Sequence, residues 1–510
     1  MAILMLLGTA VMPMSLLARD SGAAAARLKN EPTFTEAPCP DPNVPELGPA
    51  ANLPGDVTCG YLEVPENRAE PAGRTIRIAV ARVQAVSALP RLDPVVYLTG
   101  GPGGIAFLDA AGMVAKGMNA DREVIFVEQR GTYHSDPFLA CPENDVFLTH
   151  ALSLHYAAPE TGELDAASVR TCRERWVEAG VDLAAYNSAE NAADIADLRV
   201  ALGIDEWNVY GVSYGTDLAQ WLLRDHPQGI RSVVLDSVVP INQSIVEEWW
   251  PAAVRGYRAL FDACAAQPDC ASAYPDLEAE FISAVNHLNA EPLIVETTNA
   301  AGDAVMVNID GYTFANLIVQ QSYIGERGYA SVPAMIHDVA KGDGEMAATS
   351  LLSREVPPGL IGFGLGTGAY CREMAAQTTP EDVTTLAKQA LPEFPEDLFQ
   401  FVPVAGRVFE ECAVWDVGAA SPDELRAVVS DVPVLLLGGT WDMVTPYVWA
   451  EMVARGFPNA QVVAIPGGGH GLFGNFPCAR ELTAAFLDNP AAPLNTTCVT
   501  DLAVPVFSTP

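Results

Sequence analysis

Residues 207–215 of the chain read WNVYGVSYG, and this stretch decides the fold. The apolar run at 207–210 predicts a buried strand, and residues 214–224 after it predict a helix. Between them, two glycines flank Ser213 in the pattern G-x-S-x-G, which in this context is typical of a nucleophile elbow. Side chains at the glycine positions would collide with the neighbouring strand and helix. We therefore predict Ser213 as a catalytic nucleophile, the alternative being a plain tight turn.

More segments of the same kinds lie on both sides of this stretch. An alternating run (77–86), short apolar runs (95–98, 124–127, 232–236, 432–437 and 461–465) and a helix pattern (190–202) are present. Strands that alternate with helices form βαβ units and a parallel sheet. The sequence therefore predicts an α/β fold with a mostly parallel sheet flanked by helices.

The alternation stops after about residue 240 and returns near residue 430. In between lie mostly helical segments and loops rich in Gly and Pro. We predict a signal peptide at 1–26 and a first part of the core at 27–240. A mainly helical inserted cap follows at 241–428, and a second part of the core at 429–510.

Two stretches are expected to be irregular. Residues 30–60 are rich in Pro and polar residues and predict a lead-in without regular structure. The Gly-rich stretch 362–368, GFGLGTG, follows no clear strand, so we expect a flexible loop rather than a phosphate-binding loop.

Composition limits the classes of function. Half of the 510 residues are hydrophobic, which allows a sizeable core. The 64 acidic and 28 basic residues give a formal net charge of −36, which repels phosphate backbones and makes nucleic acid an improbable partner. The charge chiefly favours solubility, and it also attracts cationic substrates such as peptides with a free N-terminus.

Ten cysteines indicate an oxidising compartment. They contain no CxxC pair and have no nearby His, so they predict disulfides rather than a metal site. Sequence alone does not fix the connectivity. Pairing neighbours in order gives Cys39–Cys59, Cys141–Cys172, Cys264–Cys270, Cys371–Cys412 and Cys478–Cys498.

The N-terminal stretch agrees with export to a secreted or periplasmic location. Residues 2–18 are almost wholly apolar, and small residues follow at 22–26, as in a signal peptide. A basic n-region is missing, so a misplaced start, an unusual anchor or a disordered tail are alternatives. No later stretch reaches the roughly 18 apolar residues of a membrane span. The oligomeric state is not indicated.

A nucleophilic serine needs a base and an acid that orients the base. His470 lies in GGGHG at 467–471, directly after a predicted strand, where glycines let an imidazole reach over the elbow. We predict His470 as the base, the alternative being a loop histidine without a role. Asp442 and Asp236 both end predicted strands and compete as the acid. We favour Asp442, because its strand immediately precedes that of His470; Asp236 would then hydrogen-bond in a turn.

The Gly-rich loop GGPGG at 100–104 follows another predicted strand. Its glycines let backbone N–H groups approach a substrate oxygen closely. We predict an oxyanion hole formed by the N–H groups of Gly101 and Tyr214, the alternative being an ordinary turn. Such a site requires no metal and no organic cofactor.

Taken together, these motifs resemble a known family. GGPGG, EQRG at 128–131, GVSYG, GGTWDMVTP at 438–446 and GGGHG resemble the tripeptidyl aminopeptidase and proline iminopeptidase branch of the α/β-hydrolases, from about residue 55 onward. The resemblance implies a secreted serine exopeptidase that removes short peptides or single residues from a free N-terminus. It also implies a tripeptidyl-aminopeptidase-like segment at 429–510 and a disulfide between Cys371 and Cys412.

The chain departs from the family at several positions. Glu128 replaces the family's Asp, and Arg130 in the same motif is expected to be ion-paired near the oxyanion loop. Thr99 stands where iminopeptidases often carry His, which favours the tripeptidyl branch. Ile105 and Ala106 follow Gly104 where that branch often has Ser-Gly, which changes the expected pocket shape.

Substrate choice is expected to come from the insertion as a roof over the site. An aminopeptidase needs a carboxylate for the substrate's ammonium group, and Glu373, Glu247 or Glu248 are candidates, although solvated surface acids are the commoner case. One rival function is an esterase or amidase of small molecules with the same triad. Another is a non-catalytic binding protein, which the complete set of triad residues disfavours.

Overall fold

The computed structural model describes residues 32–40, 53–299, 302–354 and 358–510. Its main sheet has nine strands in the order β1-β2-β3-β5-β4-β6-β7-β10-β11. From β5 to β11 neighbouring strands are parallel, and β1, β2 and β3 form an antiparallel extension. The strands are β1 (Thr33–Ala37), β2 (Val57–Pro65), β3 (Thr75–Val83), β4 (Arg91–Leu98), β5 (Arg122–Val127), β6 (Trp207–Val212), β7 (Ile230–Asp236), β10 (Val434–Gly439) and β11 (Ala460–Ile465).

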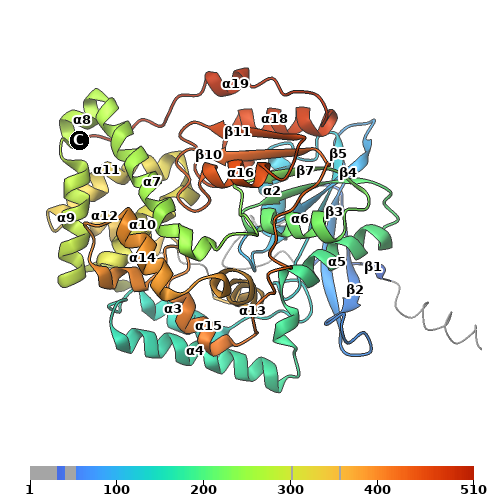
Figure 1. Ribbon diagram of the computed structural model, residues 1–510, viewed down its shortest axis with the longest axis horizontal. Helices are drawn as coiled ribbons and strands as arrows, with labels where there is room; N and C mark the ends of the chain where they lie inside the picture. The colour runs from blue at the N-terminus through green and yellow to red at the C-terminus, as the bar shows by residue number, and fades with distance from the viewer. Residues whose placement is uncertain (1–31, 41–52, 300–301, 355–357) are drawn as a thin grey trace, which may run out of the picture.

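Helices cover both faces of this sheet (Figure 1). One face packs on α5 (Ser188–Ala201), α6 (Tyr214–Asp225) and α16 (Tyr447–Ala454), and the other on α2 (Ala106–Ala115), α17 (Leu472–Asn475) and α18 (Pro477–Asp488). Successive strand residues point to opposite faces, so Val96 and Leu98 of β4 join one core and Val95 and Tyr97 join the other. Burial on both faces explains the continuous apolar runs.

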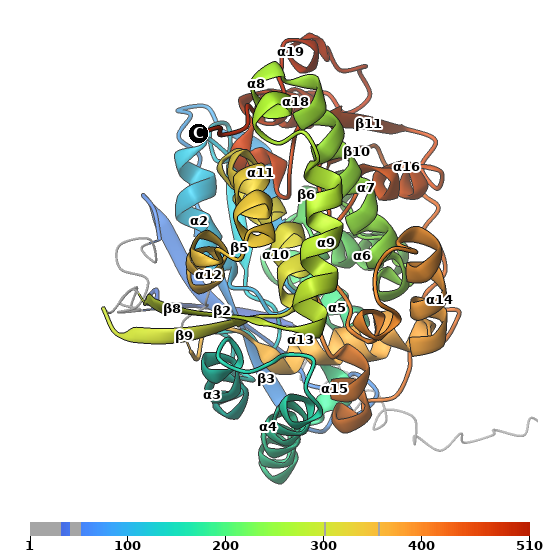
Figure 2. The same cartoon turned by 90° about the vertical axis from the view of Figure 1, so that its left-hand side faces the viewer.

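A large, mainly helical part lies beside the carboxyl ends of the parallel strands (Figures 1 and 2). It contains α7 (Ile245–Ala266), α8 (Pro268–Ala273), α9 (Leu277–Ala290), α10 (Gly311–Ile324), α11 (Glu326–Ala340), α12 (Glu345–Leu352), α13 (Phe363–Ala369), η3 (Tyr370–Met374), η4 (Ala375–Gln377), α14 (Pro380–Ala390), η5 (Glu396–Gln400) and α15 (Val408–Trp415). It also carries an antiparallel hairpin of β8 (Leu293–Thr298) and β9 (Ala304–Ile309).

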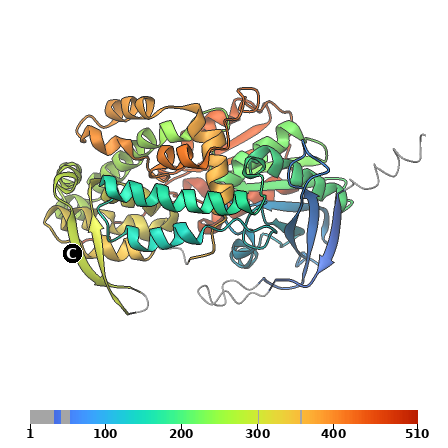
Figure 3. The same ribbon diagram turned by 90° about the horizontal axis from the view of Figure 1, so that it is seen from below.

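Two helices of the predicted first core segment lie with the inserted helices instead. These are α3 (Pro142–Ala151) and α4 (Pro159–Glu178), and Figure 3 shows α4 running beneath both parts of the molecule. Residues of α4 share a buried cluster with Leu365 and Trp415 of the insertion. Helix α4 is therefore joined in sequence to the core but packs on residues of the insertion. The domain boundaries stay a prediction.

The expected strands and helices are present, and the α/β class is confirmed. The expectation for residues 30–60 is wrong in its described part, because β1 pairs with β2 at the sheet edge. The loop expected at 362–368 is also wrong, because these residues form most of α13. Its glycines are needed for close packing: a Cβ at Gly362 would lie 2.8 Å from the carbonyl oxygen of Gly131.

All five expected cysteine pairs are bonded. They join Cys39–Cys59, Cys141–Cys172, Cys264–Cys270, Cys371–Cys412 and Cys478–Cys498. Among the described residues, no helix combines the length and the apolar character needed to cross a bilayer. The predicted signal peptide lies outside the described residues. The remaining short elements are η2 (Leu183–Ala185) and α19 (Thr497–Thr500).

Candidate active site

Ser213 occupies a strained turn between β6 and α6. Its backbone has φ 57° and ψ −128°, values that are rare for a residue with a side chain. The flanking glycines are required, because a Cβ at Gly211 would lie 2.2 Å from Gly215 O and a Cβ at Gly215 2.0 Å from Leu98 O. The steric argument for the G-x-S-x-G pattern therefore holds in this turn.

His470 and Asp442 meet directly at the carboxyl ends of β11 and β10. Nδ1 of His470 lies 2.9 Å from Oδ2 of Asp442, so the imidazole donates this hydrogen bond to the carboxylate. The hydroxyl of Thr445 donates to the same oxygen at 2.7 Å. The other oxygen of Asp442 accepts from the N–H groups of Val444 and Thr445, at 2.8 and 3.0 Å. Asp442 is thus held in one orientation by its own loop.

Asp236, the competing acid, holds the backbone of the His470 loop. Its carboxylate accepts from the N–H groups of Leu472 and Phe473 at 2.9 and 2.8 Å, and from the hydroxyl of Tyr210 at 2.6 Å. Burial raises the pKa of Asp236. Its side chain is therefore occupied by the loop, while that of Asp442 faces the imidazole.

Ser213 and His470 are not hydrogen-bonded in this structure. Nε2 of His470 is buried and has no hydrogen-bond partner among the described residues. In enzymes without substrate such contacts are often long and tighten when the substrate binds. Of the two hydrogen bonds that the predicted triad requires, the structure therefore contains the one between His470 and Asp442.

The loop GGPGG lies against Ser213. A Cβ at Gly100 would come within 2.8 Å of Ser213 Cβ, and Gly101 has φ +117°. Among the described residues no protein acceptor is present for the N–H of Gly101 or of Tyr214. Both predicted donors line the same pocket as Ser213.

The glycine-rich helix α13 supports this loop from the insertion. The N–H of Gly362 donates to Gly103 O at 3.0 Å, and a Cβ at Gly103 would lie 2.6 Å from Gly362 O. Sequence reasoning did not find this contact. The sequence feature that could have indicated this contact is the alternation of glycines at 362, 364, 366 and 368.

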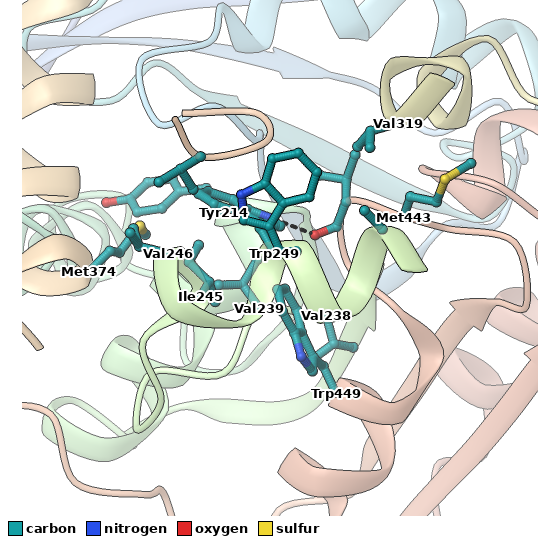
Figure 4. Close-up of a cluster of buried hydrophobic side chains, with 14 of the residues drawn as sticks. Tyr214, Val238, Val239, Ile245, Val246, Trp249, Val319, Met374, Met443 and Trp449 are labelled. Atoms are coloured by element: carbon teal, nitrogen blue, oxygen red, sulfur yellow. Dashed lines mark hydrogen bonds between the residues drawn. The ribbon is translucent and has the colours of Figure 1, made fainter. Parts of the chain in front are cut away.

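A small pocket opens beside Ser213 and is lined mainly by apolar side chains. Trp249 of α7 lies in the buried cluster that Figure 4 shows, with Tyr214, Ile245 and Met374 nearby. The residues that line the pocket are Gly101, Pro102, Ser213, Tyr214, Val239, Ile245, Trp249, Tyr323, Tyr370, Met374, Val404, Val444 and Thr445. This set includes no carboxylate.

None of the three acids predicted as candidates for substrate binding lines the pocket. Glu373 belongs to η3, is only 2% exposed, and accepts from both the N–H and the hydroxyl of Ser188. Burial raises its pKa to about 7. Glu247 lies half-buried in the first turn of α7. Neither of these two residues lines the pocket. Glu248 does not line it either; its carboxylate accepts a hydrogen bond from the side-chain amide of Gln243 and forms an ion pair with Arg255.

The EQRG motif forms a buried polar layer behind the loop. Arg130 is fully buried and bonds both oxygens of Asp194 at 2.8 Å, which is the ion pair expected from the sequence. Gln129 donates to Thr99 O at 3.0 Å, just before the loop. Glu128 accepts from the N–H of Phe107 at 3.1 Å, and burial raises its pKa to about 7.

Helix α10 contacts both loops of the His470–Asp442 pair. The N–H of His470 donates to Ser322 O at 2.9 Å, and the N–H of Met443 donates to Ser322 Oγ at 3.1 Å. The ring of Tyr323 packs edge-on against His470, with centroids 4.9 Å apart. Sequence reasoning missed these residues, since no local motif marks them.

The chain is similar to families and proteins of the hydrolase class. The model of the alpha/beta hydrolase fold family matches residues 93–281, and that of the TAP-like protein family matches residues 400–498. The tripeptidyl aminopeptidase of Streptomyces coelicolor is 25% identical over 467 residues, 86% of this chain and 82% of that protein. Serine protease Hip1 of Mycobacterium tuberculosis is 27% identical over 230 residues, 44% of this chain and 43% of its own.

A solved structure, the proline iminopeptidase of Mycobacterium smegmatis, is 17% identical over 84% of this chain and 98% of its own, with a TM-score of 0.39. The fold and the family matches define a serine hydrolase. The chain has an α/β-hydrolase fold, and its residues 400–498 are similar to the TAP-like protein family.

Proposed function

We propose that the protein is an exported serine exopeptidase that releases tripeptides or short peptides from a free N-terminus. The observation that carries the proposal is the hydrogen bond between His470 and Asp442 next to the elbow of Ser213, in a chain similar to a tripeptidyl aminopeptidase over most of its length. The five disulfides support an oxidising location.

In the proposed reaction, Ser213 Oγ attacks the scissile carbonyl carbon while Nε2 of His470 takes the hydroxyl proton. Asp442 stabilises the resulting imidazolium. The N–H groups of Gly101 and Tyr214 bind the oxyanion of the tetrahedral intermediate. The intermediate collapses to an acyl-enzyme as His470 gives its proton to the leaving amine. Water, deprotonated by His470, then attacks the ester and releases the carboxylic acid and Ser213.

The proposed acyl site is the apolar pocket beside Ser213. Its aromatic residues, Trp249, Tyr323 and Tyr370, suit an apolar side chain. Of the two proposed ammonium ligands, Glu373 is the weaker, because both of its oxygens already accept from Ser188. Glu247 keeps this role in the proposal.

A second candidate is an esterase or amidase of small molecules with the same triad. One observation favours it: no carboxylate lines the pocket within the described part of the chain. A charged N-terminus therefore has no partner directly beside the nucleophile.

The decisive experiment compares tripeptide p-nitroanilides with free and acetylated N-termini and short-chain p-nitrophenyl esters on one preparation. The proposal expects cleavage of the free tripeptides and loss of cleavage after acetylation. Equal cleavage of acetylated peptides, or ester hydrolysis alone, would establish the second candidate instead. Ser213→Ala should lower kcat by about 10⁴–10⁶-fold and abolish fluorophosphonate labelling. Full activity of that variant would refute the triad.

A further inference from the structure

The segment of residues 502–508 crosses from the hydrolase core to the inserted helices. It leaves α19 and ends beside α8 and α11 (Figure 1). Its side chains alternate: Pro505 and Phe507 are buried, while Val504 and Val506 are exposed. Phe507 is only 4% exposed, against 77% for Val506. Between residues 504 and 507, one side of the segment is therefore packed against the protein.

Polar contacts fix the segment to the inserted helices. The side-chain amide of Gln267 donates to Pro505 O at 2.9 Å and accepts from the N–H of Phe507 at 3.1 Å. The N–H of Ser508 donates to Ala330 O at 2.8 Å. The side-chain amide of Gln267 thus pairs with the backbone as a neighbouring strand would, and this fixes the position of the segment along the inserted helices.

Phe507 also contacts the loop of Asp442. Its ring stacks on Trp441 with centroids 5.7 Å apart and planes at 6°. Tyr329 packs edge-on against Trp441 at 5.4 Å, and its hydroxyl donates to Trp441 O at 2.7 Å. Trp441, the residue immediately before Asp442, is thus held between a ring of the segment and a ring of α11.

The same segment touches the loop of His470. A Cβ at Gly467 would lie 2.4 Å from Pro505 Cδ, so the two backbones are in close contact. The N–H of Trp441 donates to Gly468 O at 3.0 Å and joins the two loops. The segment is therefore in contact with both loops, through Pro505 at Gly467 and through Phe507 at Trp441.

We propose that Phe507 is a positioning residue for the reaction, which fixes Trp441 and thereby the distance between Asp442 and His470. This inference rests on the proposed function, because it requires these two residues to act in the reaction. Misplacement of such a pair by about 1 Å costs on the order of 10²-fold in rate. Phe507 touches no reacting atom, so its effect passes through Trp441.

The test is Phe507→Ala in the full chain, with Val506→Ala as the matched control. We expect kcat to fall by about 10–100-fold with KM little changed. We also expect the acid limb of the kcat/KM profile to move to lower pH, because a carboxylate farther from the imidazole stabilises the imidazolium less. Phe507→Tyr keeps the ring and should restore both quantities. Val506→Ala should behave as the wild type.

A merely structural role would lower Tm without moving the acid limb, and that result would overturn the inference. If Phe507→Ala does not fold, Gln267→Leu keeps the Phe507 side chain but removes both hydrogen bonds that hold the segment, so the ring is no longer fixed on Trp441. An unchanged acid limb and kcat in Gln267→Leu would then count against it. The two proposals can fail separately. Activity in Ser213→Ala would refute the proposed triad. An inactive Ser213→Ala together with normal kinetics in Phe507→Ala would refute only the positioning role of Phe507.

Discussion

Asp442 and Asp236 bind different parts of the same loop: Asp442 binds the imidazole of His470 at 2.9 Å, and Asp236 binds the backbone N–H groups of the two residues after Gly471. One carboxylate therefore orients the ring, and the other fixes the chain that carries it. Substitution to Asn separates these roles, since Asn keeps the size of the side chain but loses its charge.

Asp442→Asn should lower kcat by about 10⁴-fold with little change in Tm, because the neutral amide no longer stabilises the imidazolium or selects its tautomer. Asp236→Asn should instead lower the free energy of unfolding by about 1–3 kcal/mol, because one buried N–H loses its acceptor. Urea unfolding and kcat measured on both variants check this. A larger loss of kcat in Asp236→Asn, at equal folded fraction, would reverse the assignment.

The contact between Gly103 and Gly362 predicts that the oxyanion loop depends on the insertion. Gly103→Ala places a Cβ 2.6 Å from Gly362 O, so the loop must move. We expect kcat to fall by about 10²–10³-fold, the cost of losing one oxyanion donor. Gly117→Ala is the matched control, since Gly117 has φ +87°, close to the +94° of Gly103, but open space around its Cβ position.

Both variants carry the strain of a positive φ, so both should lose some stability in thermal unfolding. Only Gly103→Ala should lose activity in the folded state. Equal kcat values for the two variants would mean that α13 does not set the position of the loop.

Much of the fold and of the site could be predicted from local patterns. The strands were visible because burial on both faces makes them continuously apolar. Ser213, Asp442 and His470 each follow a strand, and the carboxyl ends of parallel strands meet at one edge of the sheet. The contact of Asp442 with the imidazole agrees with the preference for Asp442 over Asp236.

What could not be predicted depends on packing between distant segments. Ser322 acts through its backbone oxygen and its hydroxyl, and neither use leaves a sequence pattern. The charge of Glu373 predicts a ligand for an ammonium group, but the folded chain buries this residue and hydrogen-bonds it to Ser188. The Gly-rich sequence of α13 predicts a loop, since glycine has a low helix propensity, and close packing overrides that propensity here.

Glu128 predicts a pH dependence of stability that a single substitution can isolate. Burial raises its pKa to about 7 from an ordinary value near 4.5. Between these pH values the folded state keeps the proton and the unfolded state has released it. The free energy of unfolding therefore falls as pH rises through this window, by at most about 1.4 kcal/mol per pH unit from this group, and levels off above pH 7. Glu128→Gln stays neutral and should flatten the slope.

The substitution fits the site, because the new amide can donate to the hydroxyl of Thr132, which already donates to Gln129 O at 2.8 Å. The remaining oxygen still accepts from the N–H of Phe107. Urea unfolding at pH 5, 6 and 7 measures the slope, and Glu70→Gln, at an exposed position, should leave it unchanged. An identical slope in Glu128→Gln and the wild type would mean that Glu128 is already ionised in the folded protein at pH 5.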